Sequence, residues 1–141
     1  MKQKITVNQL DRLIMQFYEK LSSWEETVAE QVGLTPRQCH AVSELGEAGK
    51  IRMKLLSERL GVTTGTMTIM ADRLQKLNLI QRVEDLKDRR AFNIELTEKG
   101  REIYRSHMRH HRQLGNELFA SLSPREAHTF LSLFEKIVQG I

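Results

Sequence analysis

The feature that most constrains the fold is a tight turn at residues 61–63, which joins two short amphipathic segments. Residues 54–60 have the apolar spacing of a short helix, and Gly61 supplies the left-handed backbone that closes it. In this short helix, the side chains of Leu55, Leu56 and Leu60 are expected to face inward. Thr63 is a favourable cap for a second helix over residues 63–77, which ends before Asn78. Two helices joined in this way predict a helix-turn-helix.

The helix over residues 63–77 has one apolar face and one polar face. The apolar face is predicted to be buried and consists of Met67, Met70, Ala71, Leu74 and Leu77. The polar face, with Ile69 as its apolar exception, is expected to contact DNA bases and phosphates through Thr64, Thr66, Thr68 and Arg73. Threonines near a helix start also serve as caps, so the preceding turn is what favours a recognition helix.

Two apolar runs follow this helix, at residues 79–83 and 91–96, and they predict a β-hairpin. The connection between them, residues 84–90, is polar, basic at its end and far longer than a two-residue turn requires. A hairpin directly after a helix-turn-helix is interpreted as a wing, here over residues 79–96.

The tip of this hairpin carries Asp88, Arg89 and Arg90. An arginine at such a tip can enter an adjacent minor groove, where a narrow A·T-rich stretch concentrates negative potential. We expect Asp88 to hold the guanidinium of Arg90 in place through a charge-assisted ion pair. The alternative is an ordinary run of solvated loop charges, and the order of the elements favours contact with DNA.

Positive charge is concentrated in the middle of the chain. Residues 50–109 contain 14 Lys and Arg against 8 Asp and Glu, whereas the whole chain has a formal net charge of +4. A surface that faces phosphates needs such a local excess, because neutralised phosphates release condensed counterions. The charge alone favours a nucleic-acid partner only slightly over an ordinary solvated surface.

Long amphipathic segments flank this region. Apolar residues recur at steps of three and four over residues 7–28, which predicts a long first helix. Thr35-Pro36 predicts the start of a second helix that reaches about Leu45 before a break at Gly46. Residues 51–53 are interpreted as an extended connector only.

After the hairpin, Thr97 caps a helix predicted over residues 98–122, and Ser123-Pro124 begins a last one. The apolar stripe of the last helix consists of Ala127, Phe130, Leu131, Phe134, Ile137, Val138 and Ile141. This stripe and that of residues 7–28 are longer than one small domain easily covers, which predicts their burial in a homodimer. The alternative is that both pack within one chain.

Composition excludes several other classes. The 141 residues include eight Gly and two Pro, which favours helices, and a single Cys, which excludes an internal disulfide. No apolar run approaches the roughly 20 residues of a membrane span, and the N-terminus lacks the features of an export signal, so a cytoplasmic protein is expected. No phosphate loop, paired carboxylates or catalytic triad spacing is found, so no enzyme is expected.

The motifs together resemble those of the MarR-type winged helix-turn-helix regulators of bacteria. The matching segments are LGVT at 60–63, DRL at 72–74, LIQR at 79–82, DRR at 88–90 and LTEKG at 96–100. The resemblance implies a mainly α fold (an α+β winged helix) with long N- and C-terminal dimerisation helices. It also implies a repressor that binds a palindromic operator in double-stranded DNA as a homodimer and is controlled by a small ligand.

The resemblance implies roles for individual segments and residues. Residues 1–34 correspond to an N-terminal dimerisation helix, residues 35–97 to the DNA-binding region and residues 98–141 to C-terminal dimerisation helices, all in one structural domain. Asp88 and Arg90 match the wing motif of the family. Thr64, Thr66 and Thr68 match its base-reading face, and Arg73 matches the arginine of its recognition helix. Two positions depart from the family pattern: Ile69 stands where many members have a polar or basic residue, and Asn78 stands where glycine is usual. The base preference is therefore expected to differ, while the backbone turn is expected to survive.

Four of the five histidines lie in two places, with His40 next to Cys39 and the others at His107, His110 and His111. His107 and His111 are one helical turn apart, on a stripe that should be apolar. Three interpretations stay open. The histidines bond one another in the interior, they line an effector pocket with Cys39 for an organic or acyl ligand, or His40, His107 and His111 bind zinc.

The resemblance bears on this effector without deciding it. Zinc-responsive members have histidines at such positions and add a carboxylate from the first helix, where this chain has Ser22, with Glu25 and Glu26 nearby. Regulators of fatty-acid synthesis have similar histidines and respond to acylated carrier protein. A further interpretation is that Cys39 senses peroxide through oxidation of its thiol. The protein is expected to require no cofactor. Outside DNA recognition, the rival function is a helical module that binds other proteins.

Overall fold

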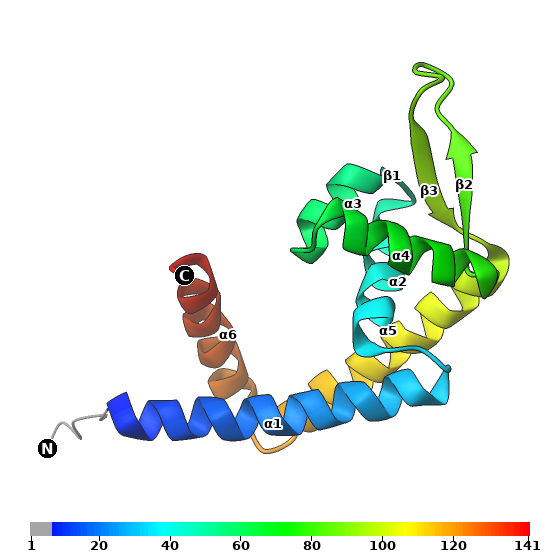
Figure 1. Cartoon of the computed structure of the whole chain (residues 1–141). Helices are drawn as coiled ribbons and strands as arrows, with labels where there is room; N and C mark the ends of the chain where they lie inside the picture. Colours follow the sequence, from blue (N-terminus) through cyan, green and yellow to red (C-terminus); the bar gives the residue numbers. More distant parts are fainter. Residues whose placement is uncertain (1–6) are drawn as a thin grey trace, which may run out of the picture. The chain divides into compact units, whose positions relative to one another are not determined.

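A computed structural model describes residues 7–141 of the chain. Its elements, in chain order, are α1 (Val7–Gln31), α2 (Pro36–Ala48), β1 (Lys50–Arg52), α3 (Met53–Leu60), α4 (Thr64–Lys76), β2 (Ile80–Glu84), β3 (Phe92–Leu96), α5 (Glu98–Phe119) and α6 (Pro124–Gln139) (Figure 1). The described residues pack as two compact units, one up to His107 and the other from Met108 to Ile141. No helix in the described range is long and apolar enough to cross a membrane.

The predicted helix-turn-helix is confirmed by α3 and α4. Gly61 has a φ of 64°, and the Thr63 hydroxyl accepts a hydrogen bond from the backbone N–H of Thr66 at 3.1 Å, so the closing glycine and the cap both stand where expected. The predictions for Leu55 and Leu77 were wrong, because these side chains are 43% and 42% exposed. Leu55 lies next to the buried Leu56 in sequence, and adjacent helical residues point about 100° apart. Leu77 is the C-cap of α4, where the chain leaves the buried face.

The wing is a projecting hairpin within a three-stranded antiparallel sheet of order β1-β3-β2 (Figure 1). Ile80 pairs with Leu96 at its base and Glu84 pairs with Phe92 toward the tip. The predicted connector at residues 51–53 includes a short strand, since Ile51 pairs with Ile94. Three residues carry too little pattern to predict a strand, and β1 exists only because β3 lies alongside it.

The end of α2 also differs from the prediction. The helix continues through Gly46 to Ala48, and Gly49 closes it by donating from its N–H to the carbonyl of Leu45 at 2.9 Å. A Cβ at Gly46 would collide with the ring of Tyr104 in α5. Gly46 is therefore a packing glycine, which a single sequence does not distinguish from a helix breaker.

Side-chain caps also fix the starts of α2, α5 and α6. Thr35 and Gln38 form a capping box at α2, as Ser123 and Glu126 do at α6. The Thr97 hydroxyl accepts from the N–H of Gly100 and donates to the carbonyl of Asn78 at 2.6 Å, which ties the start of α5 to the end of the helix-turn-helix. Asn78 has a φ of 59°, as its position at the helix end predicts.

The buried core lies under the helix-turn-helix and the sheet. Its largest fully buried side chains are Val42, Leu45, Leu56, Met67, Leu74, Leu79, Ile80 and Ile94. In contrast, α6 contains no buried residue, and the first half of α1 leaves its large apolar side chains about half exposed or more. The core therefore supports the DNA-facing elements, while two apolar helix faces stay uncovered within one chain.

Candidate nucleic-acid interface

The outward face of α4 displays the three threonines predicted to contact DNA. Thr64, Thr66 and Thr68 are all exposed, whereas Met67 and Met70 on the opposite face of the helix are buried. The Thr68 hydroxyl donates to the carbonyl of Thr64 at 2.9 Å, and the Thr66 hydroxyl oxygen accepts from Thr63 at 3.0 Å. Thr66 thus keeps its own hydroxyl proton to donate outward, and Thr68 keeps acceptor capacity.

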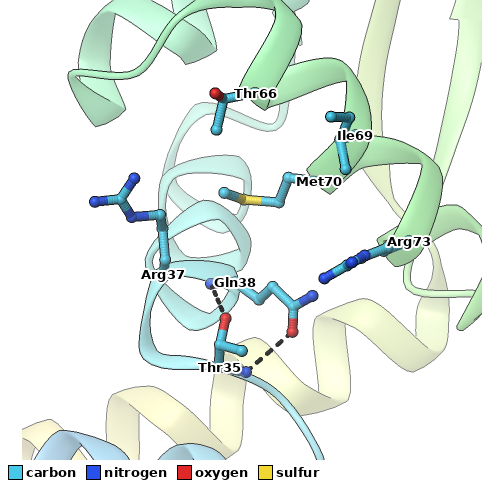
Figure 2. A pocket seen from close by; sticks show the side chains of 7 residues that line it. All are labelled: Thr35, Arg37, Gln38, Thr66, Ile69, Met70 and Arg73. Atoms are coloured by element: carbon cyan, nitrogen blue, oxygen red, sulfur yellow. Dashed lines mark hydrogen bonds between the residues drawn. The ribbon is translucent and has the colours of Figure 1, made fainter.

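A shallow hollow between α2 and α4 brings Thr66 and Arg73 together with Arg37, a residue that sequence reasoning missed (Figure 2). Arg37 lies in the first turn of α2, just after the capping Thr35. Both arginines are exposed. The sequence signals a capped helix here, but only the packing of α2 against α4 adds the Arg37 cation to the predicted surface.

The wing tip exposes Asp88, Arg89 and Arg90, as predicted. The predicted role of Asp88 is wrong in its detail, because its carboxylate accepts from the backbone N–H of Arg90 at 3.1 Å rather than from the guanidinium. A short aspartate reaches the backbone two residues ahead, and this local bond closes a turn. Asp88 therefore shapes the tip, and the Arg90 side chain extends outward.

Two ion pairs brace the wing. Arg82 of β2 donates to Asp72 of α4 at 2.6 Å, which joins the hairpin to the second helix of the helix-turn-helix. Arg52 of β1 donates to Asp85 at 2.7 Å. A hydrogen bond from the backbone N–H of Lys87, followed by that from Arg52, lowers the pKa of Asp85 below its ordinary range. These contacts fix where the tip stands relative to α4.

The predicted effector residues are distributed differently. Cys39 is buried in α2, and burial, with a smaller contribution from the Glu25 charge, raises its pKa to about 11. His40 is exposed and its Nε2 lies 3.2 Å from the Glu25 carboxylate of α1. His107 is buried in α5, and His111 belongs to the second compact unit. Since oxidation proceeds through the thiolate, the raised pKa leaves the peroxide-sensor interpretation without support.

Of the side chains that could bind zinc, the structure brings His40 close to one carboxylate, that of Glu25. Within residues 7–141, no three His, Cys, Asp or Glu side chains are grouped closely enough to hold a metal ion. A zinc site needs three or four such ligands. The described residues therefore do not fit one, and no step below depends on a metal.

Comparisons with known proteins agree with this architecture. A sequence model of the MarR family matches residues 34–92. The chain is 38% identical over 71 residues to the HTH-type transcriptional repressor MdtR of Bacillus subtilis, covering 50% of this chain and 46% of the repressor. It is 29% identical over 134 residues to the transcriptional repressor MprA of Escherichia coli K12, covering 94% and 76%. In the match to MdtR, the chain thus spans about half of its curated relative.

Solved structures extend the likeness to nearly the whole chain. The reduced form of MarR from E. coli is 27% identical, with a TM-score of 0.77 over 91% of this chain and 95% of that one. A MarR mutant from E. coli, crystallised in complex with operator DNA, is 26% identical with a TM-score of 0.74, over 91% and 92%. The curated relatives are named as regulators of transcription, in agreement with the expectation that the chain is not an enzyme. With its helix-turn-helix, its projecting wing and its N- and C-terminal helices, the chain has the winged helix-turn-helix architecture of MarR regulators, and the sequence model of that family matches its residues 34–92.

Proposed function

We propose that this protein is a sequence-specific DNA-binding regulator of transcription, acting as a repressor on a palindromic operator. The observation that carries the proposal is the juxtaposition of the threonine-lined face of α4 with a braced hairpin whose tip exposes two arginines. A helix of this kind fits the major groove, and a basic hairpin tip fits the adjacent minor groove. The operator complex of the similar E. coli MarR mutant supports this assignment.

The state of the arginines strengthens the case for phosphate and groove contacts. Arg52 and Arg82 are used within the chain, each in an ion pair with a carboxylate. Among the described residues, no ion pair includes Arg73, Arg89 or Arg90. Cations held on one face without a carboxylate partner are available to neutralise phosphates and release counterions. In the proposal, Thr64, Thr66 and Thr68 contact bases, Arg73 contacts a phosphate and the wing tip contacts the minor groove.

The proposed active form is a homodimer. Apolar side chains that are about half exposed run along the first half of α1 and along α6. An uncovered apolar stripe on a helix is a typical interface between copies of a chain. A dimer would present two recognition helices to half-sites about 34–36 Å apart, which matches one turn of DNA and explains a palindromic operator.

We further propose that a small ligand controls binding from the interior side of α2. Cys39 is buried there, His107 is buried on α5, and His40 is held by Glu25 at the surface. The imidazole groups of His40 and His107 can form hydrogen bonds with the acidic head group of an organic or acyl ligand.

The test of the proposed function is selection of duplex DNA from a random pool by the full-length protein, followed by gel-shift titrations at several salt concentrations. We expect a palindromic duplex to be enriched, with an affinity that falls steeply as salt rises because several phosphates are neutralised. A helical module that binds proteins would enrich no sequence and retard no duplex, and that result would overturn the proposal.

A further inference from the structure

The face of α4 opposite the core has an apolar side chain at its centre. Positions spaced by four, three and four residues form its outermost ridge, namely Gly65, Ile69, Asp72 and Lys76. Ile69 is 61% exposed, although the other exposed side chains around it on α4 are polar or charged. Ile69 also borders the hollow that holds Arg37 and Arg73 (Figure 2). An isoleucine therefore stands where solvent contact favours a polar residue.

No packing role among residues 7–141 explains the isoleucine at this position. A β-branched side chain is a weaker helix former than the straight-chain residues common on helix surfaces. The buried face of α4 is already supplied by Met67, Met70 and Leu74. The side chain of Ile69 thus contributes little to folding, which points to a contact outside the chain.

Gly65, one turn before Ile69, leads to the same conclusion independently. Its φ is not positive, and a Cβ there would meet only the Thr63 hydroxyl at 3.9 Å, which is ordinary contact. Alanine would fit within the protein and would favour the helix more than glycine does. The absence of a side chain leaves the backbone of the first turn bare toward the outside, as a close approach to another surface requires.

We propose that Ile69 contacts the C5-methyl group of a thymine in the major groove and that Gly65 allows the first turn of α4 to approach the bases closely enough for it. This inference rests on the proposed function and adds a specificity determinant to it. The thymine methyl is the apolar group on the major-groove edges of the four bases, and an apolar side chain is its natural partner. The neighbouring Arg37 and Arg73 cations favour a polyanion over an apolar protein surface as the occupant of this face.

A uracil scan of the selected operator tests the contact. Each symmetric pair of thymines is replaced in turn by deoxyuridine, which removes the methyl group and preserves base pairing and the minor groove. For the wild-type protein we expect one symmetric pair of thymines at which the replacement weakens binding about fifteenfold, because two buried methyl groups, one per half-site, are lost together. For Ile69→Ala, the same replacement should have no effect, because its partner is gone.

Matched variants separate this contact from general effects. Leu77→Ala trims the exposed leucine at the far end of α4 and should keep the full uracil sensitivity. Ile69→Val should keep part of it, which also covers the case in which Ile69→Ala binds too weakly to titrate. Gly65→Ala should raise the melting temperature and yet weaken operator binding, a combination that a purely structural glycine would not produce.

The outcomes distinguish the two levels of inference. Failure of the pool to yield any bound duplex would refute the proposed function. Specific binding with no uracil-sensitive thymine, or with equal sensitivity in the wild type and Ile69→Ala, would overturn the methyl contact alone. Unchanged affinity in Gly65→Ala would refute the role given to that glycine.

Discussion

At the scale of single residues, short polar side chains bind the backbone near them, and long cationic ones stay available. Asp88 accepts from the N–H of Arg90, and Thr97 bonds both Asn78 and Gly100. Such local bonds shape turns and caps. The Arg90 guanidinium is not needed for any of them, so its function and the stability of the fold should separate under mutation.

Arg90→Ala is expected to weaken operator binding by about 1–3 kcal/mol, because one groove or phosphate contact is lost. Thermal unfolding should be nearly unchanged, since the side chain is exposed at the wing tip. Gel shifts and melting curves measure the two effects. Lys20→Ala removes an equal charge from α1 and should leave affinity near the wild-type value; an equal loss of melting temperature in Arg90→Ala would instead make Arg90 a structural residue.

Asn78→Ala is expected to destabilise the fold by about 1 kcal/mol, because alanine tolerates left-handed backbone less well than asparagine. Asn78 has a φ of 59° between α4 and β2. Asn78→Gly serves as the control and should match or exceed wild-type stability. Urea unfolding of the three proteins gives the comparison, and an alanine variant as stable as wild type would contradict the argument from backbone conformation.

At the scale of elements, the wing is positioned by ion pairs to neighbouring elements rather than by a large core of its own. Arg82 joins β2 to Asp72 of α4, and Arg52 joins β1 to Asp85. Exposed ion pairs contribute little to global stability. Their geometry nevertheless determines which direction the tip points relative to α4, so their loss should affect the order of the wing before it affects unfolding.

The pKa of Asp85 provides a test of this bracing. Because the folded-state pKa is lowered, the stabilisation is fully present above the unfolded pKa of about 3.9 and is lost as pH falls through the lower folded value. Arg52→Ala should raise the pKa of Asp85 only part of the way back, since the hydrogen bond from the Lys87 backbone remains. An NMR titration of the carboxyl carbon measures this, and equal midpoints in the two proteins would refute the ion pair.

At the scale of the whole molecule, the uncovered apolar stripes of α1 and α6 are the feature that one chain does not explain. Residues on α6 such as Phe130 and Phe134 stack on each other yet stay about half exposed. Burial of such faces between two copies would contribute far more to association than the polar remainder of the surface. The oligomeric state and operator binding should therefore depend on the same residues.

Ile137→Glu is expected to shift the protein from dimer toward monomer and to weaken operator binding with it. Ile137 is 58% exposed in the single chain, so the substitution should be tolerated within the chain and disfavoured only where a second copy buries it. Lys136→Glu introduces the same residue one position away, on the polar side, and should remain dimeric. Sedimentation equilibrium decides the question, and a wild-type protein that is monomeric at all concentrations would refute the dimer.

The elements that local signals specify were predictable from the amino-acid sequence. Gly61 and Asn78 need left-handed backbone, Thr63 and Ser123 cap helices, and alternation fixes the hairpin, so the winged helix-turn-helix followed from these residues alone. Tertiary structure decided what depends on partners distant in sequence. The strand β1 exists through β3, Gly46 makes room for Tyr104, and Arg37 joins Arg73 only because α2 packs against α4. Caps and turns are stabilised by interactions between residues that are neighbours in the sequence, so a short segment predicts them. Strand pairing, close packing and the clustering of charges depend on contacts between residues far apart in the sequence, so no short segment predicts them.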